Sequence, residues 1–365
     1  MNNQLTKEIA FKELHDFFQE KPFVLFGTGM SSAVNNVFGM NSLMEYLLKE
    51  VPTKNKLNKA QENDWNAFKE ALNNGDDFEN AMNNIKNKEL ISVIVEHSGK
   101  FIAEQDYIYS LKILTGEINW PASGLFKKLV DGLAGTDREL HVATPNYDML
   151  AENAFHQNDI PYINGFWGGL AKGLDWKQSR RAITYVEKTT TGKTIKSITR
   201  EKKHISFYKV HGSLNLFFLN DSLFENNSWI YNKPEGVERL IITPGISKYE
   251  KLHRFRSELL GKYDNTIEKH NFFLFLGFGF NDNQLNTNAI ITKLKKKESN
   301  GLIITKCTND RIEDLLKKAK NLWLVCSTND NKGTVIKNSK YINELIVNNN
   351  ELWKIDIFTE TILGN

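Results

Sequence analysis

The sequence predicts an α/β fold, a Rossmann-like and mostly parallel sheet with helices on both faces and a helical insertion or cap. Three observations support this. Short apolar strands alternate with amphipathic helices after residue 271, as in sheets that helices cover on both sides. Four apolar strands end in glycine-rich or polar clusters, the arrangement found at the carboxyl edge of parallel sheets. Residues 41–133 read as helix almost throughout, between two strands.

Composition excludes several classes of protein. The chain has 365 residues, of which 40% are hydrophobic and 25% are charged, with a formal net charge of +3. These values are typical of a globular protein and give no sign of a general polyanion binder. Its two cysteines, Cys307 and Cys326, cannot build a disulfide framework or a four-thiolate zinc site. With neither a signal-peptide pattern nor an apolar run long enough to span a bilayer, we expect a cytoplasmic protein.

The elements were predicted in chain order from periodicity. An amphipathic helix over 5–18 ends before Pro22, and the strand 23–26 follows, so we divide the chain into an N-terminal helix (1–22) and one domain (23–365). That domain carries the helical insertion at about 41–133 and a basic hairpin insertion at about 171–206. The remaining predicted strands are 140–144, 205–210, 272–276, 302–305 and 322–325, and the helices are 149–156, 248–270, 283–297 and 311–320.

The polar clusters follow the strands in four places: Gly27–Ser32, Thr144–Asp148, His211–Ser213 and Gly277–Asp282. Ligands bind beyond the carboxyl ends of the strands in open parallel sheets. If these strands are neighbours, all four clusters line one crevice. Their agreement in position, more than any single cluster, therefore predicts a binding site.

Each motif taken alone is weaker evidence for a binding site. Gly27-Thr-Gly29 could let backbone N–H groups approach a phosphate, or it could be a tight structural turn, because Ser32 stands where a dinucleotide fingerprint has its third glycine. A P-loop at Thr191–Thr194 is rejected, since the required upstream glycine is Glu187. The scattered histidines predict no metal site. His211 could be a structural residue or, with an ordinary pKa of about 6.5, a general base.

In order, the four clusters resemble the sirtuin motifs Gly-Ala-Gly-x-Ser, Thr-Gln-Asn-x-Asp, His-Gly and a late Gly-Thr-Ser-like turn. The form seen here is similar to the sirtuin-like, NAD-hydrolysing domains of bacterial antiphage defence, over about residues 23–282. The resemblance implies that NAD+ is the substrate. It implies catalytic roles for Asn146, which would hold the nicotinamide-side ribose and a water, and for His211 as general base.

The same resemblance implies a set of NAD-binding residues. The first loop would hold the pyrophosphate and a ribose, Asp148 would anchor its loop or a ribose hydroxyl, and the last cluster would bind adenosine. These residues are Gly27, Thr28, Gly29, Ser31, Asp148, Gly277, Phe278 and Asp282.

Two differences from the protein-deacylating sirtuins indicate which branch of the family the sequence resembles. Between His211 and Cys307 there is no cysteine, so the zinc ribbon of that branch is missing and no zinc is expected. The Asp and Arg of the deacylase Gly-Ile-Pro-Asp-Phe-Arg loop are replaced by Gly39–Met44. Glycohydrolase chemistry needs only a stabilised oxocarbenium-like centre, an aligned water and a shielded site.

We therefore expect an NAD+ glycohydrolase that depletes NAD+ in defence when a partner or signal activates it. A non-catalytic subunit that binds NAD or ADP-ribose, an NAD-dependent deacylase and a nuclease subunit remain alternatives. By resemblance, assembly as a homo-oligomer or with a partner ATPase or sensor is expected. The basic 171–206 segment would be a solvated hairpin, a nucleic-acid contact or a subunit interface.

Overall fold

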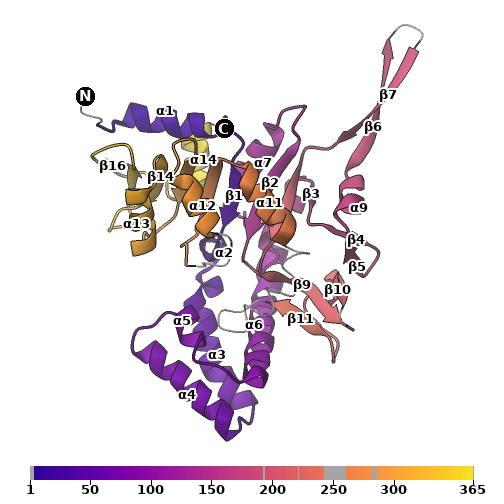
Figure 1. Ribbon diagram of the computed structural model, residues 1–365, viewed down its shortest axis with the longest axis vertical. Helices are drawn as coiled ribbons and strands as arrows, with labels where there is room; N and C mark the ends of the chain where they lie inside the picture. Colours follow the sequence, from indigo (N-terminus) through magenta and orange to yellow (C-terminus); the bar gives the residue numbers. More distant parts are fainter. Residues whose placement is uncertain are drawn as a thin grey trace.

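A computed structural model describes residues 4–191, 194–220, 222–241, 260–281, 285 and 287–364. The predicted fold class is confirmed, because the centre of the molecule is a mostly parallel nine-stranded sheet with helices on both faces (Figure 1). A layer of helices extends from one end of this sheet, and a two-stranded arm projects from another corner. None of the helices among the described residues is both long and apolar enough to cross a membrane.

The sheet has the order β16-β15-β14-β13-β12-β1-β2-β8-β3. Its strands are β1 (Phe23–Phe26), β2 (Glu139–Thr144), β3 (Tyr162–Ile163), β8 (His204–Lys209), β12 (Phe272–Leu276), β13 (Asn300–Ile304), β14 (Leu322–Ser327), β15 (Thr334–Asn338) and β16 (Leu345–Val347). From β14 to β3 all neighbours are parallel. The last two strands, β15 and β16, pair antiparallel.

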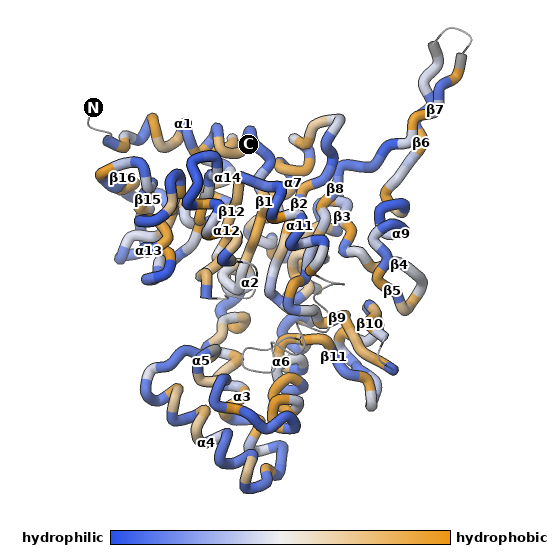
Figure 2. The backbone as a smooth tube through the Cα atoms, viewed as in Figure 1, coloured by the Kyte–Doolittle hydropathy of each residue, from blue (hydrophilic) through white to orange (hydrophobic). Residues whose placement is uncertain are grey.

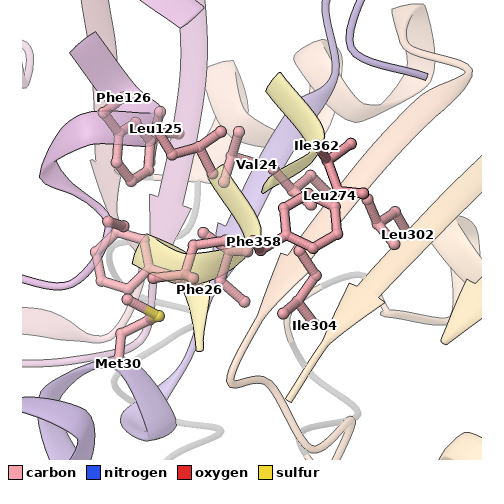
Figure 3. Packing of buried hydrophobic residues seen from close by; sticks show 14 of the residues in the cluster. Val24, Phe26, Met30, Leu125, Phe126, Leu274, Leu302, Ile304, Phe358 and Ile362 are labelled. Carbon is pink, nitrogen blue, oxygen red and sulfur yellow. The ribbon is translucent and has the colours of Figure 1, made fainter. Parts of the chain in front are cut away.

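Side chains of the strands alternate between two cores. In β1, Val24 and Phe26 belong to one core, while Phe23 and Leu25 belong to the other. Both sides of β1 are therefore apolar, and Figure 2 colours this strand as hydrophobic along its length. Figure 3 shows the first core, in which Phe26 and Phe358 pack between the sheet and its helices.

Helices cover each face. The first core is closed by α1 (Lys7–Phe17), α7 (Ser123–Asp131), α8 (Leu150–Gln157) and α14 (Ile355–Leu363). The second is closed by α11 (Gly261–Lys269), α12 (Thr287–Leu294) and α13 (Asp310–Lys318). The amphipathic pattern of α13, with Ile312, Leu315 and Leu316 buried, shows how a charged helix presents one apolar stripe to the sheet.

The helical layer follows β1 in the chain. It consists of α2 (Thr28–Val34), α3 (Met40–Lys54), α4 (Lys59–Asn73), α5 (Phe78–Met82) and α6 (Lys88–Leu114). It has its own core, in which Trp65, Phe68 and Ile94 are buried. At its other end, α6 reaches the sheet, where Asn153 of α8 donates a hydrogen bond to Ser110 Oγ (2.8 Å).

Two smaller antiparallel sheets lie beside the main one. The first has the order β11-β9-β10-β5-β4, formed by β4 (Phe166–Gly168), β5 (Lys172–Leu174), β9 (Gly212–Leu219), β10 (Ser222–Glu225) and β11 (Glu238–Ile241). The second is the hairpin of β6 (Thr184–Thr191) and β7 (Thr194–Glu201), which follows α9 (Trp176–Arg181) and forms the projecting arm (Figure 1).

Some predictions need correction or lie outside the described residues. Sequence reading placed no strand after 325, yet β15 and β16 extend the sheet; β15 is short and half-buried in alternation, a weak signal next to the continuous apolar strands. Most of the predicted helix 248–270 lies outside the described residues, and its described end is α11. The predicted helix 283–297 is described only as α12.

Candidate functional site

The four strands that precede the polar clusters are consecutive in the sheet, in the order β12-β1-β2-β8. All four are parallel, so their carboxyl ends meet at one edge. That edge opens into a cavity of about 620 Å³ shared with the helical layer. The strands that precede the four clusters are thus neighbours, which is the arrangement that a single crevice requires.

The cavity has a polar wall and an apolar wall. The predicted residues that line it are Gly27, Thr28, Asn146, Asp148, His211, Gly277 and Phe278. The apolar wall comes mainly from the helical layer, and its members are Phe38, Met40, Leu43, Met44, Leu48, Leu72, Phe78, Phe101 and Ile102. Sequence reading missed these apolar residues, because their helical periodicity is the same as that of ordinary core positions.

Two predicted residues, Gly29 and Ser31, are not among the lining residues, and a third, Asp282, lies outside the described residues. Gly29 and Ser31 lie behind the lining, where they contact the residues that do line the cavity. The first and last clusters nevertheless meet directly, through their glycines.

Gly27, Gly29 and Gly277 form a close backbone contact between the ends of β1 and β12. A Cβ atom on Gly27 would lie 2.7 Å from Gly277 O, and one on Gly29 would lie 2.7 Å from Gly277 Cα. Gly277 also has φ +53°, a conformation that favours glycine. The N–H groups of Gly27 and Gly29 donate to Leu276 O (3.0 Å) and Gly277 O (3.1 Å). These two N–H groups therefore join the loops together, and the expected contact with a phosphate has to come from elsewhere.

Asn146 is the most constrained polar side chain on the wall. Its Nδ2 donates to Gly27 O (3.0 Å) and to Ser31 Oγ (2.9 Å), which fixes the orientation of the amide because a carbonyl can only accept. The side chain is 7% exposed. Its Oδ1 has no hydrogen-bond partner among the described residues. A buried amide oxygen in this state is suited to a water or a ligand.

Asp148 and Ser31 support this arrangement. Ser31 Oγ donates to Asp148 Oδ2 (2.7 Å) while it accepts from Asn146. The chain Asp148–Ser31–Asn146 thus gives each hydroxyl and amide proton a defined acceptor. Asp148 is therefore bonded to the loop that follows β1, and its role toward a ligand stays a prediction.

The backbone of the Pro145–Met149 turn is held from several sides. Leu214 N–H donates to Tyr147 O (3.0 Å), and Lys209 Nζ donates to Asp148 O. Lys209 also pairs with Glu152 Oε1 (3.2 Å), and both side chains are buried. Burial raises the pKa of Glu152, and Lys209 opposes that shift.

Asp106 of α6 holds the same turn from the helical layer. Its Oδ1 accepts from Met149 N–H (2.6 Å) and its Oδ2 accepts from Tyr231 Oη–H (2.9 Å). Sequence reading missed Asp106. The available signal was its place on the buried stripe of α6, where Ala103, Ser110 and Ile113 are also buried.

His211 lines the cavity from the end of β8 and is 5% exposed. The glycine that follows it is required by the structure. Gly212 has φ +85°, and a Cβ there would lie 2.1 Å from Leu240 O of the adjoining sheet. The His-Gly pair thus turns the chain from the main sheet into β9 and leaves the imidazole at the cavity.

The described residues offer no cluster of metal ligands, and three cations of the basic segment are paired within the chain. Among the described residues, no group of three or more His, Cys, Asp or Glu side chains could hold a metal ion. In the basic 171–206 segment, several cations already have partners within the chain. Lys172 pairs with Glu225, Arg180 with Glu139 and Glu201, and Arg200 with Glu187.

Comparison with known proteins places the chain in a family. The family model for the SIR2-like domain matches residues 140–325, more than half of the 365 residues, so the chain belongs to the SIR2-like domain family. The match contains the Asn146 and His211 clusters and the last glycine cluster, and Gly27 lies before it. This membership supports an NAD-related function of the sirtuin type.

Among solved structures, one described as "Structural Basis for the Mechanism and Regulation of Sir2 Enzymes" is similar at 12% identity and a TM-score of 0.38, over 85% of this chain and 90% of that one. No curated protein matches this chain.

Proposed function

We propose that this protein is an NAD+ glycohydrolase that converts NAD+ and water into nicotinamide and ADP-ribose. The observation that carries the proposal is the Asn146 amide. Its Nδ2 is held by two acceptors, its buried Oδ1 has no partner among the described residues, and Asn146 and His211 line the same cavity. An amide oxygen and an imidazole at one cavity can orient a water and take its proton.

In the proposed reaction, the bond between C1′ of the ribose and the nicotinamide nitrogen breaks. Its electron pair passes to the pyridinium ring and yields neutral nicotinamide. Asn146 Oδ1 orients the water whose oxygen forms the new bond to C1′, and His211 accepts the water proton. The apolar wall that includes Phe38, Met44 and Phe101 excludes bulk water and suits the nicotinamide ring.

The size of the cavity supports NAD+ as the ligand. Ligand cavities of ~300–1,000 Å³ with apolar walls and a few fixed polar groups are typical for molecules of this size, and this cavity has about 620 Å³. Because Gly27 N–H and Gly29 N–H are engaged, the pyrophosphate would have to be bound by Thr28 and the cluster around Gly279 and Asn281, which also line the cavity.

The test is nicotinamide release from NAD+ by the purified protein, alone and with the products of neighbouring genes. We expect Asn146→Ala and His211→Ala to lower the rate by about 10²–10⁴-fold, the usual range for a positioned acid or base. His15→Ala, at an exposed position on α1, is the matched control. Hydrolysis that survives both substitutions would contradict the assigned roles.

We place the activity in antiphage defence, where it would deplete NAD+ after a partner or signal activates the enzyme. A binding subunit without catalysis is the second candidate. If the protein is such a subunit, it should bind NAD+ or ADP-ribose but release no nicotinamide with any of the partners tested. A deacylase would instead release nicotinamide only when an acyl-lysine peptide is present.

A further inference from the structure

Asp106 is an unusual acid for a helix interior. It lies within the 27-residue helix α6 and is 0% exposed. No described cation forms an ion pair with it. Its two hydrogen bonds go to the turn after β2, through Met149 N–H, and to Tyr231. Buried carboxylates without a counter-ion are costly, so a specific role is expected for this one.

The bond to Met149 N–H directly links the helical layer to the polar wall. Met149 directly follows Asp148, and Asn146 is three residues earlier in the same turn. The other described hydrogen bonds to the backbone of this turn come from the strands β8 and β9, through Lys209, Ser213 and Leu214, and from helix α8, through Asn153. Asp106 adds a bond from the helical layer, so the turn is held by both layers.

We propose that Asp106 is a positioning residue, whose carboxylate sets the position of the Asn146–Asp148 turn and makes its order depend on the helical layer. The inference rests on the proposed function for its meaning in catalysis, but its structural content can be measured without substrate. Asp106 does not line the cavity, so it acts through the turn.

The protonation state of Asp106 bears on the strength of this hold. Burial, and next the charge of Asp148, raise the pKa of Asp106 to about 7, while the bonds from Met149 and Tyr231 oppose the shift. The other charged groups that face it are Glu152 on α8, which adds to the shift, and Lys209, which pairs with Glu152. Ionisation strengthens the hydrogen bond from Met149 N–H but also sets Asp106 against the charge of Asp148, so the strength of the hold changes as the pH passes through 7.

The change in stability on substitution of Asp106 distinguishes a positioning residue from a residue that only stabilises the fold. Because the folded-state pKa lies above the ordinary value of 3.8, the folded state binds the proton more tightly than the unfolded chain does. Ionisation of Asp106 therefore lowers the stability of the fold as the pH rises from about 4 to about 7, and the effect is complete above that pH. Asp106→Asn should raise the unfolding temperature at pH 8, whereas loss of a merely supporting residue would lower it.

The experiment is hydrogen exchange of the full chain, followed on the peptide that contains residues 145–150, at pH 6 and pH 8 after correction for intrinsic exchange. We expect Asp106→Ala to lower protection of the Met149 amide at pH 8 by about tenfold or more. Asp106→Asn keeps an acceptor for Met149 N–H, so protection should stay within about threefold of wild type and lose its dependence on pH. Tyr231→Phe removes the second partner alone and should give an intermediate result.

Two results would overturn the inference: unchanged protection in Asp106→Ala, or a pH dependence in Asp106→Asn equal to that of wild type. If Asp106→Ala fails to fold, the comparison of Asp106→Asn with wild type decides alone. Absence of nicotinamide release by the wild-type protein would count against the proposed function only. If the activity is present, Asp106→Ala should lower kcat more than it changes KM, because the position of Asn146 is altered while the glycine clusters and the apolar wall are kept.

Discussion

Single glycines determine how the two glycine clusters meet. Gly27 and Gly29 permit an approach of backbones that no other residue would allow, and Gly277 adds a left-handed conformation. The glycine pattern in the sequence therefore has a packing cause in this protein, in addition to any role toward a ligand. The two interpretations of Gly27-Thr-Gly29, a tight structural turn and a ligand-binding loop, are compatible, because the loop packs closely against Gly277 and also lines the cavity.

Gly277→Ala should lower the free energy of unfolding by about 1–3 kcal/mol, from the strained φ and the contact of its Cβ with Gly29. Gly279→Ala is the matched control two residues on, since a Cβ there meets nothing closer than Asn309 Nδ2 at 3.4 Å. Urea unfolding measures both variants. Equal losses in the two would show that the contact between the loops does not stabilise the fold.

Lys209→Met should be strongly destabilising, by about 3–5 kcal/mol, because it leaves the Glu152 carboxylate buried without its cation. Removal of Lys209 also removes the influence that lowers the pKa of Glu152, so that pKa rises further. Glu152 can then be neutral in the folded state at lower pH. The loss should accordingly be smaller at pH 5.5 than at pH 8, as measured by urea unfolding, and a loss independent of pH would contradict this account.

Among the elements, the β6–β7 hairpin projects from the rest of the molecule (Figure 1). It forms a sheet of its own and is held at its base by Arg180 to Glu201 and Arg138 to Tyr185. Its outer part exposes Val186, Ile195 and Ile198. Several of its neighbouring cations have internal partners, so the segment is less basic in space than its sequence suggests.

Removal of residues 187–198, with two glycines joining Val186 to Thr199, should change the melting temperature by less than about 2 °C. Those two residues are directly paired, and the base contacts of the hairpin are retained. A two-stranded hairpin adds little stability on its own. Thermal unfolding followed by circular dichroism is the measurement, and a large drop would show that the arm supports the core.

At the scale of the whole molecule, buried histidines make stability depend on pH. Burial lowers the pKa of His141 to about 3, against the attraction of Glu139. In the folded state the ring therefore stays neutral, whereas the unfolded chain takes up a proton below about pH 6.5. Stability contributed by His141 is present above pH 6.5 and is lost as the pH falls toward 3.

His141→Gln should flatten the fall in unfolding free energy between pH 6.5 and 5 by up to about 1.4 kcal/mol per pH unit. Glutamine can keep a hydrogen bond to Tyr208 Oη, which lies 3.1 Å from His141 Nδ1. His15→Gln, at an exposed position, should leave the slope unchanged. An unaltered slope in His141→Gln would mean that other groups account for the acid sensitivity.

Two kinds of feature could be predicted from the sequence: elements with a regular apolar pattern, and polar residues that directly follow apolar strands. Continuous apolar runs such as Phe272–Leu276 can hardly be anything except buried strands, and polar residues directly after them mark the carboxyl edge. The apolar cavity wall and Asp106 could not be predicted in the same way. Their roles depend on which helix lies opposite the sheet edge, and that is decided by tertiary packing.

Helix α6 is unbroken from the outer helices to the turn beside the cavity. Lys88 and Asp106 are eighteen positions apart in it, about 27 Å along the axis at the usual rise per residue. If helix α6 moves as a rigid body, a tilt of about 5° about its inner end displaces its outer end by roughly 2 Å. Conversely, a displacement of the outer end changes the orientation of the helix at Asp106. A displacement of the distal helices would therefore move the Pro145–Met149 turn without any change inside the cavity itself.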